Sequence, residues 1–421
     1  MPLDVFQQVF SLSLASNLVN DLKGTEASLQ AALRLGLTVA LPIIDLGWKL
    51  VWGPVVWKHE PNDAETGPDN SWYIAYHPRL QFEDGSVHPT YVIAIAGTPA
   101  ESTYVWTEEN FAVNSVSDFK AWVAGGIQNC PVVVPPKNVV PGNAYIATGT
   151  VNTVHLLLTT PAPEGAVSPG TTLLDFIANV DQSASPRFIT TGHSLGGALS
   201  PSLALALVSA GVIPSDTTLT YPSAGPSPGN IGFTELFVET LPARKSDEAV
   251  GYKGWNLNLV NTLDVVPQAW AVFRAISPEQ NLGNIPPIYG RPVIPLVAGA
   301  TLVFALRALS SGVRYKPLPS QYFTGPPPSA TPTDLIEFLK VAVEEHVPPY
   351  LKEVGITIPT LDRSTILDRG LREKTEVEIR FNYPVISDLE WALEHPKEAQ
   401  DAIDRAKGSE EGKAVLSENA Y

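Results

Sequence analysis

The 421-residue sequence is poor in cysteine, in positive charge and in long uncharged apolar runs. Cys130 is its one cysteine, so the chain has no internal disulfide and no site with several thiolate ligands. Basic residues number 27 against 43 acidic ones, and the resulting net charge of −16 repels phosphate backbones and anionic lipid. These shortages argue against a nucleic-acid partner, a cysteine-based metal site and a cysteine protease.

The start of the chain lacks the features of a secretory signal, because it has no basic region and Asp4 precedes its first apolar stretch. With the absence of disulfides, this favours a cytoplasmic location; secretion is the alternative if a signal was removed. Apolar residues dominate 31–57. Arg34, Asp45 and Lys49 interrupt them, so no window reaches ~18 uncharged apolar residues and we expect no transmembrane segment. A pair of core-facing helices is the preferred interpretation, and contact with a membrane surface is the alternative.

With 44% hydrophobic residues, the chain can bury a large core. Strand and helix patterns alternate along it, which predicts an α/β fold with a largely parallel central sheet flanked by helices. We expect a helical N-terminal extension over 1–60, packed on the core, and a main domain over 61–360. An insertion at 268–313 precedes the last strand pattern, and a charged C-terminal extension covers 361–421, as a solvated helix or a frayed tail.

A glycine-rich turn stands between a strand pattern and a helix pattern. Gly192, Ser194 and Gly196 satisfy G-x-S-x-G, in which small neighbours let a serine occupy a strained turn without collision. The amide of Leu195 then opens the helix, where a backbone N–H can hold a negative oxygen. We interpret Ser194 as a nucleophile, the alternative being a purely structural joint. Pro201 predicts a kink or a break within the helix.

A serine hydroxyl needs an imidazole to take its proton and a carboxylate to orient that imidazole. In α/β hydrolases the order is serine, acid, histidine, which leaves His346 and His395. His346 follows a helix pattern at a proline-bounded break and is the predicted base; a half-exposed histidine at a helix end is the alternative. His395 lies in the charged tail, where a solvated role is expected.

Asp264 is the predicted acid. Among the aspartates that follow Ser194, it alone ends an apolar strand pattern, and ligands and catalytic loops gather at such ends in open α/β sheets. An aspartate that caps the turn before Pro267 is the alternative.

Five motifs together resemble those of the class 3 lipases, the fungal triacylglycerol lipase family within the α/β hydrolases. They are VIAIAGT at 92–98, ITTGHSLGGALS at 189–200, TYPSAGPSPGNIGF at 220–233, VNTLDVVP at 260–267 and HVPPYL at 346–351. The resemblance implies an α/β hydrolase fold with Ser194 as nucleophile, Asp264 as orienting acid and His346 as general base. Thr98 and Leu195 would be the oxyanion donors.

The resemblance also places the residues after Thr98 at the family's lid position. Candidate substrate contacts are therefore Tyr104, Trp106 and Phe111, together with His193, and the apolar insertion could wall an acyl pocket or belong to the core. Two departures from the family's pattern stand out. Ala96 replaces a usual arginine, and AYIATGT at 144–150 replaces a common His-x-Gly-Phe segment.

These residues predict a serine hydrolase that cleaves carboxylic esters of neutral lipids or other apolar esters through an acyl-enzyme, without metal or cofactor. Action at a lipid–water interface is a further hypothesis. The alternatives are an esterase or acyltransferase for a phospholipid, feruloyl or polyester substrate, and a lipase-like protein that binds lipid without catalysis.

Overall fold

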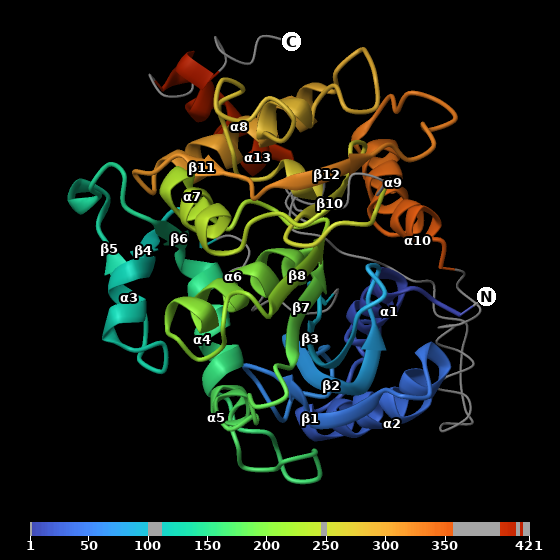
Figure 1. Ribbon diagram of the computed structural model, residues 1–421. Coiled ribbons are helices and arrows are strands. Elements are labelled where there is room, and N and C mark those ends of the chain that lie inside the picture. The colour runs from blue at the N-terminus through green and yellow to red at the C-terminus, as the bar shows by residue number, and fades with distance from the viewer. Residues whose placement is uncertain (1, 100–111, 246–250, 357–395, 410–412, 416–421) are drawn as a thin grey trace.

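The computed structural model describes residues 2–99, 112–245, 251–356, 396–409 and 413–415. Its centre is a seven-stranded sheet in the order β1-β2-β3-β7-β8-β10-β12 (Figure 1). Strands β1 to β3 pair antiparallel, and every pairing from β3 to β12 is parallel. The predicted α/β fold with a largely parallel sheet is confirmed. The strands are Lys49–Trp57, Asn70–Gln81, Val87–Ile95, Arg187–His193, Thr218–Ser223, Asn258–Asn261 and Ser320–Phe323, in that spatial order.

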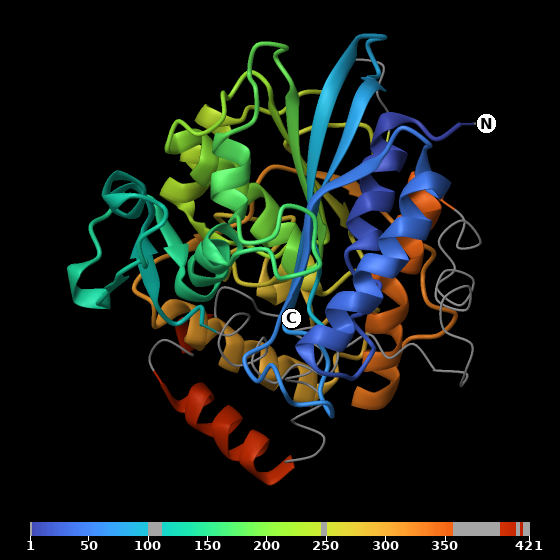
Figure 2. The same cartoon turned by 90° about the horizontal axis from the view of Figure 1, so that it is seen from below.

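Helices cover both faces of this sheet, as Figure 2 shows. One face carries α1 (Val5–Ala15), α2 (Glu26–Ile44) and α10 (Pro348–Val354), and the other carries α3 to α7. Side chains along a strand point alternately to the two sides, so Trp72 joins one core and Tyr73 the other. Burial on both faces explains why the central strands read as almost continuous apolar runs. The second group of helices comprises Phe119–Gly125, Thr148–Thr159, Leu173–Ala178, Leu195–Ser209 and Ile231–Thr240.

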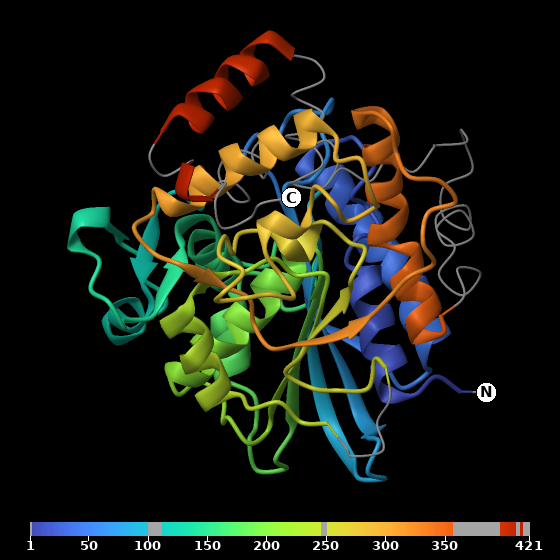
Figure 3. The same ribbon diagram turned by 90° about the horizontal axis from the view of Figure 1, so that it is seen from above.

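A third apolar cluster lies beyond the carboxyl ends of the parallel strands. It contains α8 (Pro295–Leu309) and α9 (Leu335–His346), with the short turns Val266–Gln268 and Leu282–Asn284. The terminal helix α13 (Pro396–Gly408) packs against α8 (Figure 3). Ile403 fills the space over Gly299, where an added Cβ would lie 2.5 Å from its Cδ1. The C-terminal extension is therefore docked on the insertion through this helix.

A small antiparallel sheet extends one side of the molecule in the order β11-β9-β6-β4-β5. It brings together short segments from distant parts of the chain, near the 3-10 turn Pro136–Asn138. Its strands are Tyr315–Lys316, Gly229–Asn230, Tyr145–Ala147, Val116–Asp118 and Val133–Val134.

Three local predictions differ from the structure. Residues 49–57, expected to be helical, form β1, because β-branched Val55 and Val56 pair with β2. The apolar spacing from Ser115 to Val123 predicts a helix, but the helix begins at Phe119, with Asp118 accepting the Ala121 N–H at 3.0 Å. Residues 116–118 form β4. Helix α6 runs through Pro201 without interruption, so of the predicted kink or break, the break is wrong.

Among the described residues, α2 reaches the length and hydropathy of a membrane span, and 44% of the tested window is buried inside the structure. Core helices of soluble proteins pass the same test, so this is weak evidence for a span.

Candidate active site

Ser194 occupies a strained turn between β7 and α6. Its φ is +62° and its ψ is −123°, a conformation that residues with a side chain rarely adopt. The flanking glycines make the turn possible: a Cβ on Gly196 would lie 2.5 Å from the Ile95 carbonyl oxygen, and one on Gly192 would collide with Gly196 itself. The Ser194 N–H donates to the carbonyl of Ser223 at 3.0 Å, which ties the turn to β8.

The Ser194 hydroxyl is buried, with 1% of the residue exposed, and its Oγ has no hydrogen-bond partner among the described residues. A buried hydroxyl without a partner carries a free-energy cost that proteins tend to retain for function. Leu195 is the first residue of α6, so its N–H lies at a helix N-terminus beside this hydroxyl.

Asp264 and His346 are in direct contact, although 82 residues separate them in the chain. His346 Nδ1 lies 2.7 Å from Asp264 Oδ2, and both side chains are fully buried. Asp264 follows β10, and His346 ends α9, which lies across the same edge of the sheet. The carboxylate on Nδ1 selects the tautomer that carries its proton there, so Nε2 is the nitrogen that can accept another.

Two further donors hold the Asp264 carboxylate in place. The hydroxyl of Tyr350 donates to Oδ2 at 2.8 Å, and the N–H of Val266 donates to Oδ1 at 2.9 Å. Tyr350 Oη also accepts the N–H of Asn261 at 3.0 Å. Sequence reasoning missed Tyr350, although it stands one helical turn after His346 in HVPPYL. Its position in that motif is the signal that could have found it.

Asn261 and Glu345 form a second polar pair beside this group. The Asn261 amide donates to the Glu345 carboxylate at 2.8 Å and to its carbonyl at 2.9 Å. Burial raises the pKa of the Glu345 carboxyl, and the hydrogen bond from Asn261 partly offsets this effect. The pair joins the end of β10 to the end of α9, and it was not predicted from the sequence.

His193 connects the serine turn to the histidine. It immediately precedes Ser194, and its ring centroid lies 4.7 Å from that of His346 and 5.0 Å from that of Tyr350. Its Nδ1 is 2.9 Å from the Ser223 hydroxyl. Burial lowers the pKa of His193 well below its usual value, and the neighbouring His346 adds to this effect. His193 thus packs against the ring of His346, and its predicted contact with substrate stays a prediction.

Thr98 lies just past the end of β3, the strand that neighbours β7 in the sheet. The two strands pair in parallel with Ile95 opposite Gly192, so their ends reach the same edge of the sheet. Gly97 packs against the serine turn: a Cβ there would lie 2.9 Å from the His193 carbonyl oxygen and 3.3 Å from the Ser194 Cβ. Thr98 is 7% exposed, and Leu195 is 4% exposed. The two predicted oxyanion donors thus come from segments that flank the serine.

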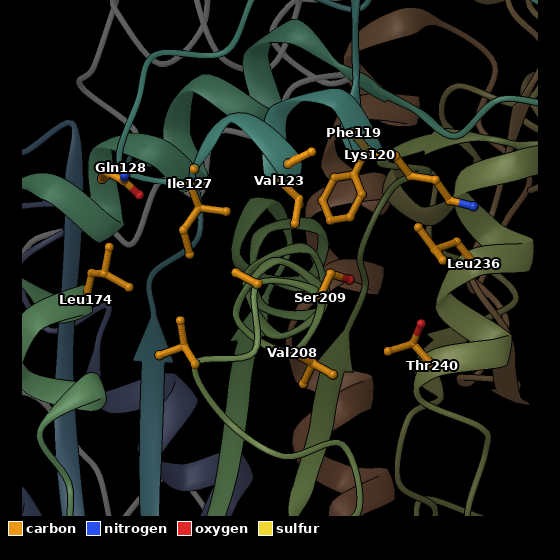
Figure 4. A pocket seen from close by; sticks show the side chains of 14 residues that line it. Phe119, Lys120, Val123, Ile127, Gln128, Leu174, Val208, Ser209, Leu236 and Thr240 are labelled. Carbon is orange, nitrogen blue, oxygen red and sulfur yellow. The ribbon is translucent and has the colours of Figure 1, made fainter.

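Tyr104, Trp106, Phe111 and His395 lie outside the described residues. The apolar insertion belongs largely to the third core cluster, where α8 packs with the residues that follow Asp264. An open groove of about 650 Å³ lies between α3, α6 and α7 (Figure 4). The residues that line this groove do not include Ser194, Asp264 or His346, so it is separate from the candidate active site.

Residues 92–273 match the family described as Lipase (class 3). No curated protein matches the chain in sequence. Among solved structures, M37 lipase aligns over 87% of this chain and 99% of its own, with 21% identity and a TM-score of 0.61, and so shares the fold. The lipase of Rhizopus microsporus var. chinensis aligns over 59% of this chain and 71% of its own, with 14% identity and a TM-score of 0.30. The lipase of Yarrowia lipolytica aligns over 62% and 73%, with 17% identity and a TM-score of 0.37.

Proposed function

We propose that the chain is an ester-hydrolysing enzyme of the class 3 lipase family, whose model matches residues 92–273, and that Ser194, His346 and Asp264 form its catalytic triad. The observation that carries the proposal is the buried contact between His346 Nδ1 and Asp264 Oδ2, which are 2.7 Å apart. The ring of His346 also packs against the ring of His193, the residue that precedes Ser194. A buried carboxylate that orients an imidazole, which in turn takes the proton of a serine hydroxyl, is the arrangement that activates a serine.

In the proposed reaction, Ser194 Oγ attacks the ester carbonyl carbon while His346 Nε2 takes its proton. The resulting imidazolium is stabilised by the Asp264 carboxylate. The carbonyl oxygen becomes negative and accepts hydrogen bonds from the N–H of Leu195 and from the N–H and hydroxyl of Thr98. His346 then returns the proton to the leaving alcohol, which leaves an acyl group on Ser194. Water, activated by the same histidine, releases the carboxylic acid.

We propose esters of neutral lipids as the substrate class. The net charge of −16 disfavours anionic headgroups, and the class 3 lipase match favours apolar acyl esters. A series of p-nitrophenyl esters from acetyl to palmitoyl tests this: a rising kcat/KM with chain length supports a lipase, and a maximum at acetyl supports an esterase for other esters. Equal rates on micellar and monomeric substrate would exclude interfacial activation.

Hydrolysis of p-nitrophenyl butyrate by Ser194→Ala tests the nucleophile. The matched control is Ser200→Ala. Ser200 lies in α6, is buried like Ser194, and its Oγ likewise lacks a hydrogen-bond partner among the described residues. We expect Ser194→Ala to lose all measurable turnover and Ser200→Ala to keep the wild-type rate. Wild-type turnover by Ser194→Ala would refute the assignment, and a wild-type protein inactive on every ester would favour a non-catalytic lipid-binding role.

A further inference from the structure

We propose that Asn17 and Asn20, in the turn after α1, are positioning residues that set the direction of the Thr98 N–H. This inference rests on the proposed function, in which that N–H is one of the oxyanion donors. Both asparagines belong to the N-terminal extension and precede the segment that matches the lipase family. The extension would therefore complete the catalytic machinery in addition to covering the sheet.

The two side chains hold opposite ends of one residue, Gly97. Oδ1 of Asn17 accepts the Gly97 N–H at 2.8 Å, and Nδ2 of Asn20 donates to the Gly97 carbonyl oxygen at 3.1 Å. Nδ2 of Asn20 also donates to Oδ1 of Asn17 at 2.9 Å, so the two amides are tied to each other. The backbone of Gly97 is thereby clamped on both sides.

Peptide planarity carries this clamp to Thr98. The Gly97 carbonyl and the Thr98 N–H belong to one peptide unit, and in a trans peptide they point in opposite directions. A donor that holds the carbonyl in one direction therefore aims the N–H in the other. The same peptide lies beside the nucleophile, since an added Cβ on Gly97 would come 3.3 Å from the Ser194 Cβ.

The amide orientations agree with this role. Nδ2 of Asn17 donates to the Ser13 carbonyl at 2.9 Å and to the Ser16 hydroxyl at 3.3 Å, so its four hydrogen-bonding positions are all used. Oδ1 of Asn20, in contrast, is buried without a partner within the described ranges. Turning this amide over would set Oδ1 against the oxygens of Gly97 and Asn17. The cost of the unsatisfied oxygen is thus accepted in exchange for the donor on Gly97.

The turn that carries both asparagines is itself anchored to the sheet. The Ser71 hydroxyl donates to the Ser16 carbonyl at 2.8 Å, and the Ser71 carbonyl accepts the Ala96 N–H at 2.9 Å. The Tyr73 hydroxyl donates to the Leu12 carbonyl at 2.8 Å. Because Ser71 contacts both segments, it fixes the asparagine turn relative to the end of β3.

Asn20→Asp tests the inference, because it keeps the size of the side chain and replaces the donor with an acceptor that repels the Gly97 carbonyl. Loss of an oxyanion donor costs about 10²–10³ in kcat, and a misdirected donor should lose part of this. We expect kcat on p-nitrophenyl butyrate to fall at least ~10-fold while KM changes less than about twofold. Affinity for an alkylboronic acid, which forms a tetrahedral adduct with an active-site serine, should fall in parallel.

Asn256→Asp is the matched control, since Asn256 is a buried asparagine whose Nδ2 donates to the Pro242 carbonyl at 2.8 Å. It should lose stability but keep kcat and boronate affinity. A folded Asn20→Asp with wild-type kcat and boronate affinity would overturn the inference, and so would an equal loss of kcat in Asn256→Asp. If Asn20→Asp does not fold, Asn20→Ala removes the donor without adding a charge and carries the same expectation. The proposed function is tested separately, by comparing ester hydrolysis by the wild-type protein with that by Ser194→Ala.

Discussion

His346 Nδ1 lies 2.7 Å from Asp264 Oδ2 in a pair of side chains that are both fully buried. The carboxylate is also held by the Tyr350 hydroxyl and the Val266 N–H, so it cannot turn away from the ring. A buried carboxylate fixed in this way stabilises an imidazolium more strongly than one in water, because the surrounding dielectric is lower. This pair is the basis of the first two predictions.

Asp264→Asn should lower kcat by about 10⁴ with little change in KM, because an amide at this position no longer selects the productive tautomer. The measurement is steady-state hydrolysis of p-nitrophenyl butyrate. Asp175→Asn is the control: Asp175 is an exposed residue in the first turn of α5, where its carboxylate accepts the hydroxyl of the N-cap residue Thr172. A kcat within tenfold of wild type in Asp264→Asn would remove Asp264 from the triad.

Tyr350→Phe should reduce kcat by about tenfold, since Asp264 loses one donor and the Asn261 N–H loses its acceptor. Unfolding should also become easier by about 1–3 kcal/mol, the usual cost of a buried group left unsatisfied. Tyr221→Phe is the comparison, because its buried hydroxyl donates to the Tyr252 carbonyl at 2.9 Å. Tyr221→Phe should lower the stability of the protein without lowering kcat. An equal loss of kcat in Tyr221→Phe would mean that Tyr350 contributes only through packing.

Thr98→Val keeps the branched shape and the backbone N–H but removes the hydroxyl. If that hydroxyl donates to the oxyanion, kcat should fall by about a hundredfold, with the fold retained. Thr153→Val, in α4, removes a buried hydroxyl that donates to the Gly149 carbonyl at 2.9 Å and should leave kcat unchanged. An unaffected Thr98→Val would leave the amides as the sole oxyanion donors.

Glu345→Gln should change how stability depends on pH. Burial raises the pKa of Glu345 in the folded state above its unfolded value, so folding is favoured while the carboxyl is protonated. That contribution is present below the unfolded pKa and is lost as the pH rises through the folded pKa. Glutamine can still accept the hydrogen bond from Asn261 and cannot ionise. The Tm of Glu345→Gln relative to wild type should therefore rise between pH 4 and pH 7, and a constant difference would contradict this.

The sequence predicted the α/β fold and named Ser194, Asp264 and His346, because each stands at a pattern boundary: a glycine turn, a strand end and a proline break. The order of the triad residues left His346 and His395 as candidates, and the proline break favoured His346, which the structure places in contact with Asp264. Residues without such local signals were missed. Asn17, Asn20 and Asn261 make contacts that are long-range in sequence, which no local periodicity encodes. Tyr350 was missed although it stands in the HVPPYL motif, because its contact with Asp264 spans 86 residues.

The misassigned elements have a similar cause. Residues 49–57 continue the apolar character of α2, so their periodicity alone did not distinguish a strand from a helix, and pairing with β2 decided the outcome. The continuity of α6 through Pro201 also depended on its surroundings, because the helix is buried along most of its length. In both places tertiary packing outweighed local propensity.

The most direct test of the triad is peptide-mapped mass spectrometry after treatment with a fluorophosphonate, which modifies a serine hydroxyl only when a neighbouring base activates it. We predict one phosphonylated residue, Ser194, in the wild type, with labelling slowed at least ~10³-fold in His346→Ala. Labelling of a different serine, or equally fast labelling of Ser194 in His346→Ala, would contradict the catalytic arrangement proposed for this enzyme.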